Sequence, residues 1–205
     1  MSNHVVLITG FGPFHGHNVN ASWEAVKLVP SESIKEADVI VQEIPVIYNV
    51  VDSVVPQLWE KYNPSLVIHV GVSAEARKIT IESQAHRTGY VRVDCTGKEH
   101  QTKEVCTVTE GLDCIKPGLD VGEICNFINR NTQIKACVSQ NAGRYLCEYI
   151  FYKSLSIDFQ KTLFIHVPPL DNPYTAEELA TALRAIVRCA LQQLNNKCNI
   201  GNTSN

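Results

Sequence analysis

The chain has 205 residues, a formal net charge of −3 and 44% hydrophobic residues, a composition that predicts a globular protein with a continuous core. Its slightly acidic balance provides no basic face, so we expect neither nucleic acid nor a membrane surface as a partner. No apolar run approaches the roughly 20 residues that span a bilayer. The N-terminus passes directly into the first expected strand without room for a signal peptide, and we therefore expect a cytosolic protein.

Strands and helices are expected to alternate, because short apolar runs are separated by segments whose apolar residues recur three and four apart. In chain order the expected elements are a strand over residues 5–9, a helix over 23–29, a strand over 38–46, a helix over 50–62, strands over 66–70 and 78–85, a helix over 121–129, a strand over 134–138, a helix over 144–156, a strand over 162–167 and a helix over 176–195. Strand 78–85 is expected to pair next to strand 66–70. Residues 87–119 are polar and rich in glycine and threonine, which predicts a long loop with one short hairpin.

This order predicts an α/β fold: a three-layer α/β/α sandwich with a largely parallel, twisted mixed sheet, and with active groups at the carboxyl ends of the strands. Residues that commonly cap helices support the helix assignments, namely Asn20 or Ser22, Asp120, and Thr175 with Glu178 three residues later. The chain contains no internal repeat or linker, so we expect a single domain over residues 1–205. The polar tail over 196–205 is expected to be frayed.

Cysteine is frequent, with eight residues at positions 95, 106, 114, 125, 137, 147, 189 and 198. An even number suits the disulfide framework of a short secreted domain, but not a chain of this length that we expect in the cytosol. The spacing contains no C-x-x-C pair and no close cysteine–histidine arrangement typical of zinc. We therefore interpret most of these residues as buried or surface thiols and expect no metal site.

Cys147 is the candidate nucleophile because it lies in the first turns of an expected helix, after a turn that contains Gly143. The partial positive charge at a helix N-terminus stabilises a thiolate, which is the reactive form of cysteine. His166 ends the strand over 162–167 just before two prolines, where an α/β protein would place a general base. The alternative interpretation is a buried thiol and a core imidazole.

A third group, Glu82, would sharpen this assignment by orienting the imidazole of His166. Its carboxylate interrupts an otherwise apolar expected strand. A charge in such a strand is costly unless it is paired or functional. The alternative for Glu82 is a solvated position at the edge of the sheet.

Residues 10–16 (GFGPFHG) form a glycine-rich loop after the first expected strand. The G-x-G spacing resembles a dinucleotide-binding fingerprint, but Pro13 has no N–H group to offer a phosphate, and no acidic residue clearly ends the second strand to hold a ribose. Phe11 and Phe14 could instead form the walls of a small apolar ligand slot. Ordinary core packing is the alternative for both phenylalanines.

Together, these segments resemble the pyroglutamyl peptidase I (pyrrolidone-carboxylate peptidase) family. The resemblance is carried by residues 10–14 (GFGPF), 20–22 (NAS), 139–147 (SQNAGRYLC) and 164–169 (FIHVPP), runs in order from Val5 to about Leu194, and is closer to the animal than to the bacterial enzymes. It implies an α/β/α sandwich and a cysteine peptidase that removes pyroglutamate from the N-terminus of small peptides. It implies no cofactor and no obligatory protein partner.

The resemblance also implies roles for individual residues. Cys147 would be the nucleophile, His166 the general base and Glu82 its orienting carboxylate. The implied substrate pocket consists of Phe11 and Phe14 flanking the lactam ring, Tyr145 and Leu146 closing the pocket, and the backbone carbonyl near Val72 accepting the lactam N–H.

Arg92 corresponds in spacing alone to an arginine of the family. Bacterial members of the family carry an arginine ten residues after the glutamate, near the oxyanion, and Arg92 has this spacing although the intervening sequence differs. Two other functions stay open at this point. One is a nucleotide- or nucleoside-binding α/β protein that uses the glycine-rich loop, and the other is a catalytically silent relative that acts as a binding protein.

Overall fold

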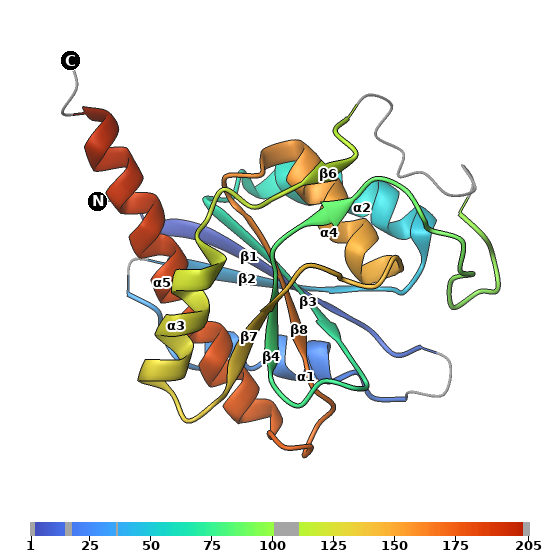
Figure 1. Cartoon of the computed structure of the whole chain (residues 1–205), viewed down its shortest axis with the longest axis horizontal. Coiled ribbons are helices and arrows are strands. Elements are labelled where there is room, and N and C mark those ends of the chain that lie inside the picture. The colour runs from blue at the N-terminus through green and yellow to red at the C-terminus, as the bar shows by residue number, and fades with distance from the viewer. Residues whose placement is uncertain (1–2, 15–17, 36, 101–110, 203–205) are drawn as a thin grey trace.

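The computed structural model describes residues 3–14, 18–35, 37–100 and 111–202. A six-stranded sheet with the strand order β2-β1-β3-β8-β4-β7 forms its centre (Figure 1). The strands are β1 (His4–Phe11), β2 (Ala37–Ile44), β3 (Leu66–Val72), β4 (Ile79–Glu82), β7 (Ala136–Ser139) and β8 (Thr162–Val167). The first four strands in this order are parallel to one another, β4 is antiparallel to β8, and β7 is parallel to β4. The largely parallel mixed sheet is therefore confirmed.

Helices cover both faces of the sheet and complete the three expected layers (Figure 1). One face packs against α1 (Ala21–Val26), α3 (Val121–Asn131) and α5 (Ala176–Asn202), and the other against α2 (Tyr48–Tyr62) and α4 (Leu146–Asp158). A short 3₁₀ helix, η1 (Val29–Ser31), follows α1. In β1, Val6 and Ile8 face the first group of helices and Leu7 faces the second. Burial on both faces explains why the central strands are apolar without interruption.

The position of β4 differs from the expectation. It does not lie next to β3, because β8 comes between them and pairs with both. The expected strand over 78–85 is also divided: β4 ends at Glu82, and Ala85–His86 forms β5, which pairs with β6 (Cys114–Ile115) in a separate two-stranded sheet. Apolar patterns specify which face of a strand is buried, but the neighbour of a strand depends on pairing with distant segments.

The loop between β5 and β6 packs beside the carboxyl-terminal end of β2 and the start of α4. The backbone N–H of Cys95 donates to the carbonyl of Val46 (3.1 Å), and the hydroxyl of Tyr145 donates to the carbonyl of Val93 (3.1 Å). These bonds place Arg92 near the start of α4. The short hairpin expected within 87–119 is not found in the described part of this stretch: β6 pairs with β5, which ends at His86, and residues 101–110 lie outside the described residues.

Helix α5 extends further than expected, because it continues to Asn202 and does not end near Asn195. The tail predicted to be frayed is thus helical over 196–202, while 203–205 lie outside the described residues. Contacts to other segments explain the extension. The side chain of Asn195 contacts the imidazole of His4 (3.1 Å), and the ammonium of Lys197 donates to the carbonyl of Gly118. None of the described helices is both long and apolar enough to cross a membrane.

Candidate active site

The turn before α4 presents Cys147 to the pocket. Gly143 (φ +99°) and Arg144 (φ +50°) both have left-handed backbone conformations, so the helix begins at Leu146 and not at Arg144 as expected. Cys147 is therefore the second residue of α4. The side chain of Tyr145, the residue before the helix, makes no capping hydrogen bond, so the first N–H groups of α4 lack the usual acceptor from the N-cap residue. The N–H groups at a helix start carry partial positive charge, and here they lie at the position of Cys147 in the first turn.

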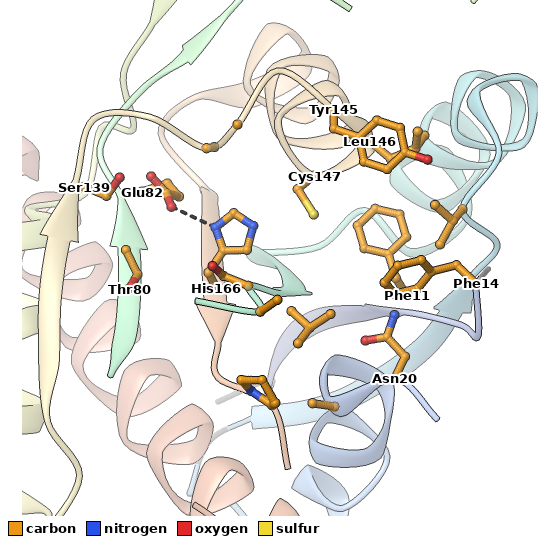
Figure 2. Close-up of a pocket in the computed structure, with 18 of the residues that line it drawn as sticks. Phe11, Phe14, Asn20, Thr80, Glu82, Ser139, Tyr145, Leu146, Cys147 and His166 are labelled. Carbon is orange, nitrogen blue, oxygen red and sulfur yellow. Dashed lines mark hydrogen bonds and ion pairs between the residues drawn. The ribbon is translucent and has the colours of Figure 1, made fainter. Parts of the chain in front are cut away.

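His166 and Glu82 form a buried pair, in which the imidazole Nδ1 lies 2.8 Å from the carboxylate Oε1 (Figure 2). Only 8% of His166 and 1% of Glu82 are exposed. The register of the sheet brings them together: Thr80 on β4 is directly opposite His166 on β8, and Glu82 is two residues further along the same face. Residues in this relation are diagonal neighbours within reach of long side chains.

The second imidazole nitrogen of His166 is left for Cys147, and in Figure 2 this nitrogen lies on the side of the ring that faces Cys147. Burial alone would lower the pKa of His166. A hydrogen bond and charge interaction with Cys147, and the same interactions with Glu82, outweigh burial and raise the pKa of His166 to about 10. The imidazole is therefore held in its protonated form beside the sulfur at neutral pH.

Gly71, near the end of β3, lies against both of these side chains. A Cβ atom at this position would lie 2.7 Å from the sulfur of Cys147 and 2.9 Å from the ring of Phe164. It would also lie 3.4 Å from Cδ2 of His166. A larger residue would thus displace the thiol, so glycine is needed here for the close approach of the sulfur to the strand.

A cavity of about 570 Å³ opens over these residues. Its wall includes every residue that the sequence analysis assigned to the site, namely Phe11, Phe14, Val72, Glu82, Arg92, Tyr145, Leu146, Cys147 and His166. In Figure 2, Phe11 and Phe14 lie together on the side of the cavity opposite Glu82, with Cys147 and His166 between. The aromatic slot and the candidate catalytic residues are therefore parts of one pocket.

Residues 20–22 hold the aromatic loop in place. Asn20 donates from its side-chain amide to the carbonyl of Gly12 (2.9 Å), and the backbone N–H of Phe11 donates to the hydroxyl of Ser22 (3.0 Å). The Asn20 side chain also caps α1 by accepting from the N–H of Ser22 (3.1 Å). These bonds fix the loop relative to α1. The expected cap of this helix by Asn20 is confirmed, whereas the bonds that hold the aromatic loop were not predicted from the sequence.

The same loop does not have the geometry of a phosphate-binding loop. The N–H of Phe11 is already bonded to Ser22, and the N–H of Gly12 donates to the carbonyl of Ile44 (3.0 Å). Pro13 has no N–H group. The N–H groups of Phe11 and Gly12 are therefore engaged within the protein, contrary to what a nucleotide phosphate requires.

Arg92 lies at the outer wall of the pocket. Its guanidinium carbon is 4.1 Å from the centroid of the Tyr145 ring, which is a cation–π distance. The side chain is otherwise exposed. The structure thus places Arg92 at the pocket, with its guanidinium over the ring of Tyr145.

Comparison with known proteins gives the same assignment. A sequence model of the family described as pyroglutamyl peptidase matches residues 4–189. The chain belongs to the pyroglutamyl peptidase family. It is 40% identical over 195 residues to pyroglutamyl-peptidase 1 of Homo sapiens, covering 92% of this chain and 90% of the relative. It is 33% identical over 193 residues to the pyrrolidone-carboxylate peptidase of Thermococcus onnurineus, covering 88% of this chain and 94% of the relative.

Solved structures of the pyroglutamyl peptidase family share this fold. The pyroglutamyl peptidase I of Bacillus amyloliquefaciens superposes with a TM-score of 0.84 at 26% identity, covering 94% of this chain and 98% of that chain. The pyrrolidone carboxyl peptidase of Thermococcus litoralis gives a TM-score of 0.85 at 27% identity, covering 95% and 96%. The expected closeness to animal members is confirmed, since mammalian relatives share 40–41% identity and archaeal and bacterial ones 30–33%.

Proposed function

We propose that this chain is a cysteine peptidase that hydrolyses the amide bond after an N-terminal pyroglutamyl residue and releases 5-oxoproline. The observation that carries the proposal is that Cys147, His166 and Glu82 share one cavity with two phenylalanines. Nucleophile, base and orienting carboxylate supply the chemistry of acyl transfer. The aromatic walls suit a flat, uncharged ring.

In the first step the thiolate of Cys147 attacks the carbonyl carbon that joins pyroglutamate to the second residue. A carbon–sulfur bond forms, and the carbonyl oxygen becomes an oxyanion. The uncapped N–H groups at the start of α4 are its proposed donors. One well-placed donor stabilises such a transition state by about 3–4 kcal/mol.

His166 then transfers its proton to the leaving amine, the carbon–nitrogen bond breaks, and a thioester remains on Cys147. In the second half-reaction His166 takes a proton from water, whose oxygen attacks the thioester. The carbon–sulfur bond breaks, 5-oxoproline leaves, and the thiolate–imidazolium pair is restored. Glu82 orients the imidazole throughout by accepting from Nδ1 (2.8 Å). No step of this scheme requires a metal or a cofactor.

Selectivity follows from the charge of the substrate's end. A pyroglutamyl residue has no ammonium group. Among the described residues, Glu82 is the one acidic side chain that lines the cavity, and it is paired with His166 on the side away from Phe11 and Phe14. We assign the backbone carbonyl of Val72, which lines the cavity, as acceptor of the lactam N–H. An ordinary N-terminus would leave an unpaired charge in the aromatic slot beside the cation of Arg92. Substrates with a free N-terminal amine should therefore be strongly excluded.

Arg92 is proposed to close the pocket through its contact with Tyr145, with no direct bond to the oxyanion. The partners of the enzyme are small peptides with an N-terminal pyroglutamate, and the scheme needs no nucleic acid, membrane or obligatory protein partner. We further propose that residues 1–205 act as one peptidase domain in the cytosol. The described cysteine side chains are free thiols, which suits a reducing compartment.

The test is the release of a fluorophore from a pyroglutamyl amide under reducing conditions, beside the matching prolyl and glutaminyl amides. The proposal predicts cleavage of the pyroglutamyl compound alone. Equal cleavage of all three would contradict the lactam selectivity. Folded, reduced protein that cleaves none would instead favour a silent binding relative, and a nucleotide-binding protein would bind nucleotide without any thiol-dependent activity.

A further inference from the structure

Glu148 follows the nucleophile in the chain and is completely buried. Its carboxylate accepts the backbone N–H groups of Arg144 (2.8 Å) and His86 (2.9 Å). It also contacts the guanidinium of Arg144 and Nδ1 of His86 (2.8 Å). Burial would raise the pKa of Glu148, but the hydrogen bonds from Arg144 and His86 hold it below its usual value. A charged carboxylate therefore ties β5, the turn and the catalytic helix together.

Comparison with α5 shows what is unusual about this carboxylate. Glu178 is the third residue of α5 and forms a reciprocal capping box with Thr175, the residue before the helix. The N–H of Glu178 donates to the Thr175 hydroxyl (3.2 Å), and the N–H of Thr175 donates to the Glu178 carboxylate (2.8 Å). Glu148 is likewise the third residue of its helix, but it reaches one residue further back, past Tyr145 to Arg144.

The hydrogen bond from the N–H of Arg144 to Glu148 stabilises a strained turn. Arg144 has a left-handed conformation (φ +50°), which is costly for a residue other than glycine and persists only where its surroundings impose it. Glu148 holds Arg144 by its backbone and its guanidinium. The side chain of Arg144 also packs on Gly89, where a Cβ atom would lie only 3.1 Å from Cδ of Arg144.

We propose that Glu148 is a positioning residue for the reaction. By holding Arg144 in its left-handed conformation, Glu148 directs the chain into α4 so that the uncapped N–H groups at the helix start face the oxyanion formed at Cys147. In Figure 2 this helix start faces the cavity through Tyr145, Leu146 and Cys147. The inference rests on the proposed function, and Glu148 itself does not contact the substrate.

The test compares Glu148→Gln with the matched variant Glu178→Gln, which alters the same helix position away from the pocket. Glutamine keeps the size of the side chain but removes the charge and one acceptor. The measured quantities are kcat and KM for a pyroglutamyl amide, and the affinities for two inhibitors. Pyroglutamyl aldehyde accepts the thiolate at its carbonyl carbon and forms an oxyanion, whereas 2-pyrrolidone fills only the ring slot.

For Glu148→Gln we expect kcat and the affinity for the aldehyde to fall together by about 10- to 100-fold, as a misplaced oxyanion donor predicts. The affinity for 2-pyrrolidone should stay within about twofold, because this ligand develops no oxyanion. Glu178→Gln should leave all of these values unchanged.

Wild-type kcat and aldehyde affinity in Glu148→Gln would overturn the inference, even if the melting temperature falls. An equal loss of 2-pyrrolidone affinity would also overturn it, because it would indicate general damage to the pocket. If Glu148→Gln does not fold, Glu148→Asp gives the same test, because the shorter side chain keeps the charge but withdraws the acceptor from the N–H of Arg144: a loss of kcat and aldehyde affinity without loss of 2-pyrrolidone affinity is expected, and wild-type values overturn the proposal. An inactive wild-type chain would contradict the proposed function instead, so the two failures are distinguishable.

Discussion

Nδ1 of His166 lies 2.8 Å from Oε1 of Glu82, across the antiparallel pair of β8 and β4. The other carboxylate oxygen of Glu82, Oε2, is buried and has no hydrogen-bond partner within the part of the chain that the structure describes. A buried carboxylate with a free oxygen is costly for the fold, and such groups are expected where chemistry requires them. The relationship explains why the ring of His166 is oriented with Nε2 toward Cys147.

Replacing Glu82 with glutamine should lower kcat strongly and leave KM nearly unchanged. The amide cannot stabilise the imidazolium, and it no longer enforces the tautomer that presents Nε2 to the sulfur. By analogy with other catalytic triads, we expect a loss of about 10²- to 10⁴-fold in kcat. Steady-state kinetics on a pyroglutamyl amide measure this loss, with Glu178→Gln as control. Activity within threefold of wild type would remove Glu82 from the catalytic assignment.

The raised pKa of His166 also predicts how stability depends on pH. Its pKa is about 10 in the folded protein, against an ordinary value of 6.5 for histidine. Between these values the folded state binds the proton and the unfolded state does not. The stability that protonated His166 contributes to the folded state is therefore fully present below pH 6.5 and is lost as the pH rises through about 10.

Urea unfolding of the wild type and of His166→Gln at a series of pH values checks this sign. Using the difference between the two proteins removes the titration of other groups. The advantage of the wild type in free energy of unfolding should shrink as the pH rises from 7 toward 10. A difference that grows with pH would contradict the raised pKa.

Gly71→Ala should reduce activity because the added Cβ would meet the sulfur of Cys147 at 2.7 Å. Overpacking of this kind costs about 1–3 kcal/mol of stability, and movement of the nucleophile reduces kcat further, by about 10²-fold. The matched control is Gly122→Ala on α3, where a Cβ would lie 3.2 Å from Oδ1 of Asp120. Thermal unfolding measures the loss of stability, and kcat measures the displacement of the nucleophile. Full activity in Gly71→Ala would contradict the close packing of Gly71 against the sulfur of Cys147.

Phe14→Ala should weaken substrate binding, since it removes one wall of the proposed lactam slot. The loss of roughly 1.5 kcal/mol of apolar contact corresponds to about a tenfold rise in KM. Phe159→Ala, at the far end of α4 and 46% exposed, is the control for loss of an aromatic ring. An unchanged KM with a lowered kcat would show that Phe14 does not bind the ring.

Much of the fold could be predicted from the sequence, because both faces of the central strands are buried and their apolar runs are unbroken. The position of β4 next to β8 could not be predicted, since it depends on pairing between Thr80 and His166, which are far apart in the chain. The start of α4 at Leu146 could not be predicted either. Apolar spacing continues through Arg144, whose left-handed conformation depends on bonds to Glu148.

The candidate site was largely predictable because its residues belong to short motifs that a family resemblance brings together. Their chemistry, a cysteine at a helix start and a histidine at a strand end, was visible independently. The residues that hold the catalytic and aromatic side chains in place could not be predicted. Gly71 was visible only as a glycine at the end of a buried strand, and the role of Asn20 depends on its bond to the carbonyl of Gly12.

The most direct test of the central claim is the activity of Cys147→Ser on a pyroglutamyl amide under reducing conditions, beside Cys125→Ser, which removes a free thiol on α3 away from the cavity. If Cys147 is the nucleophile, Cys147→Ser should lose at least about 10⁴-fold in kcat/KM while remaining folded, and Cys125→Ser should match the wild type. Substantial activity in folded Cys147→Ser would contradict the account, because the proposed thioester cannot form without that sulfur.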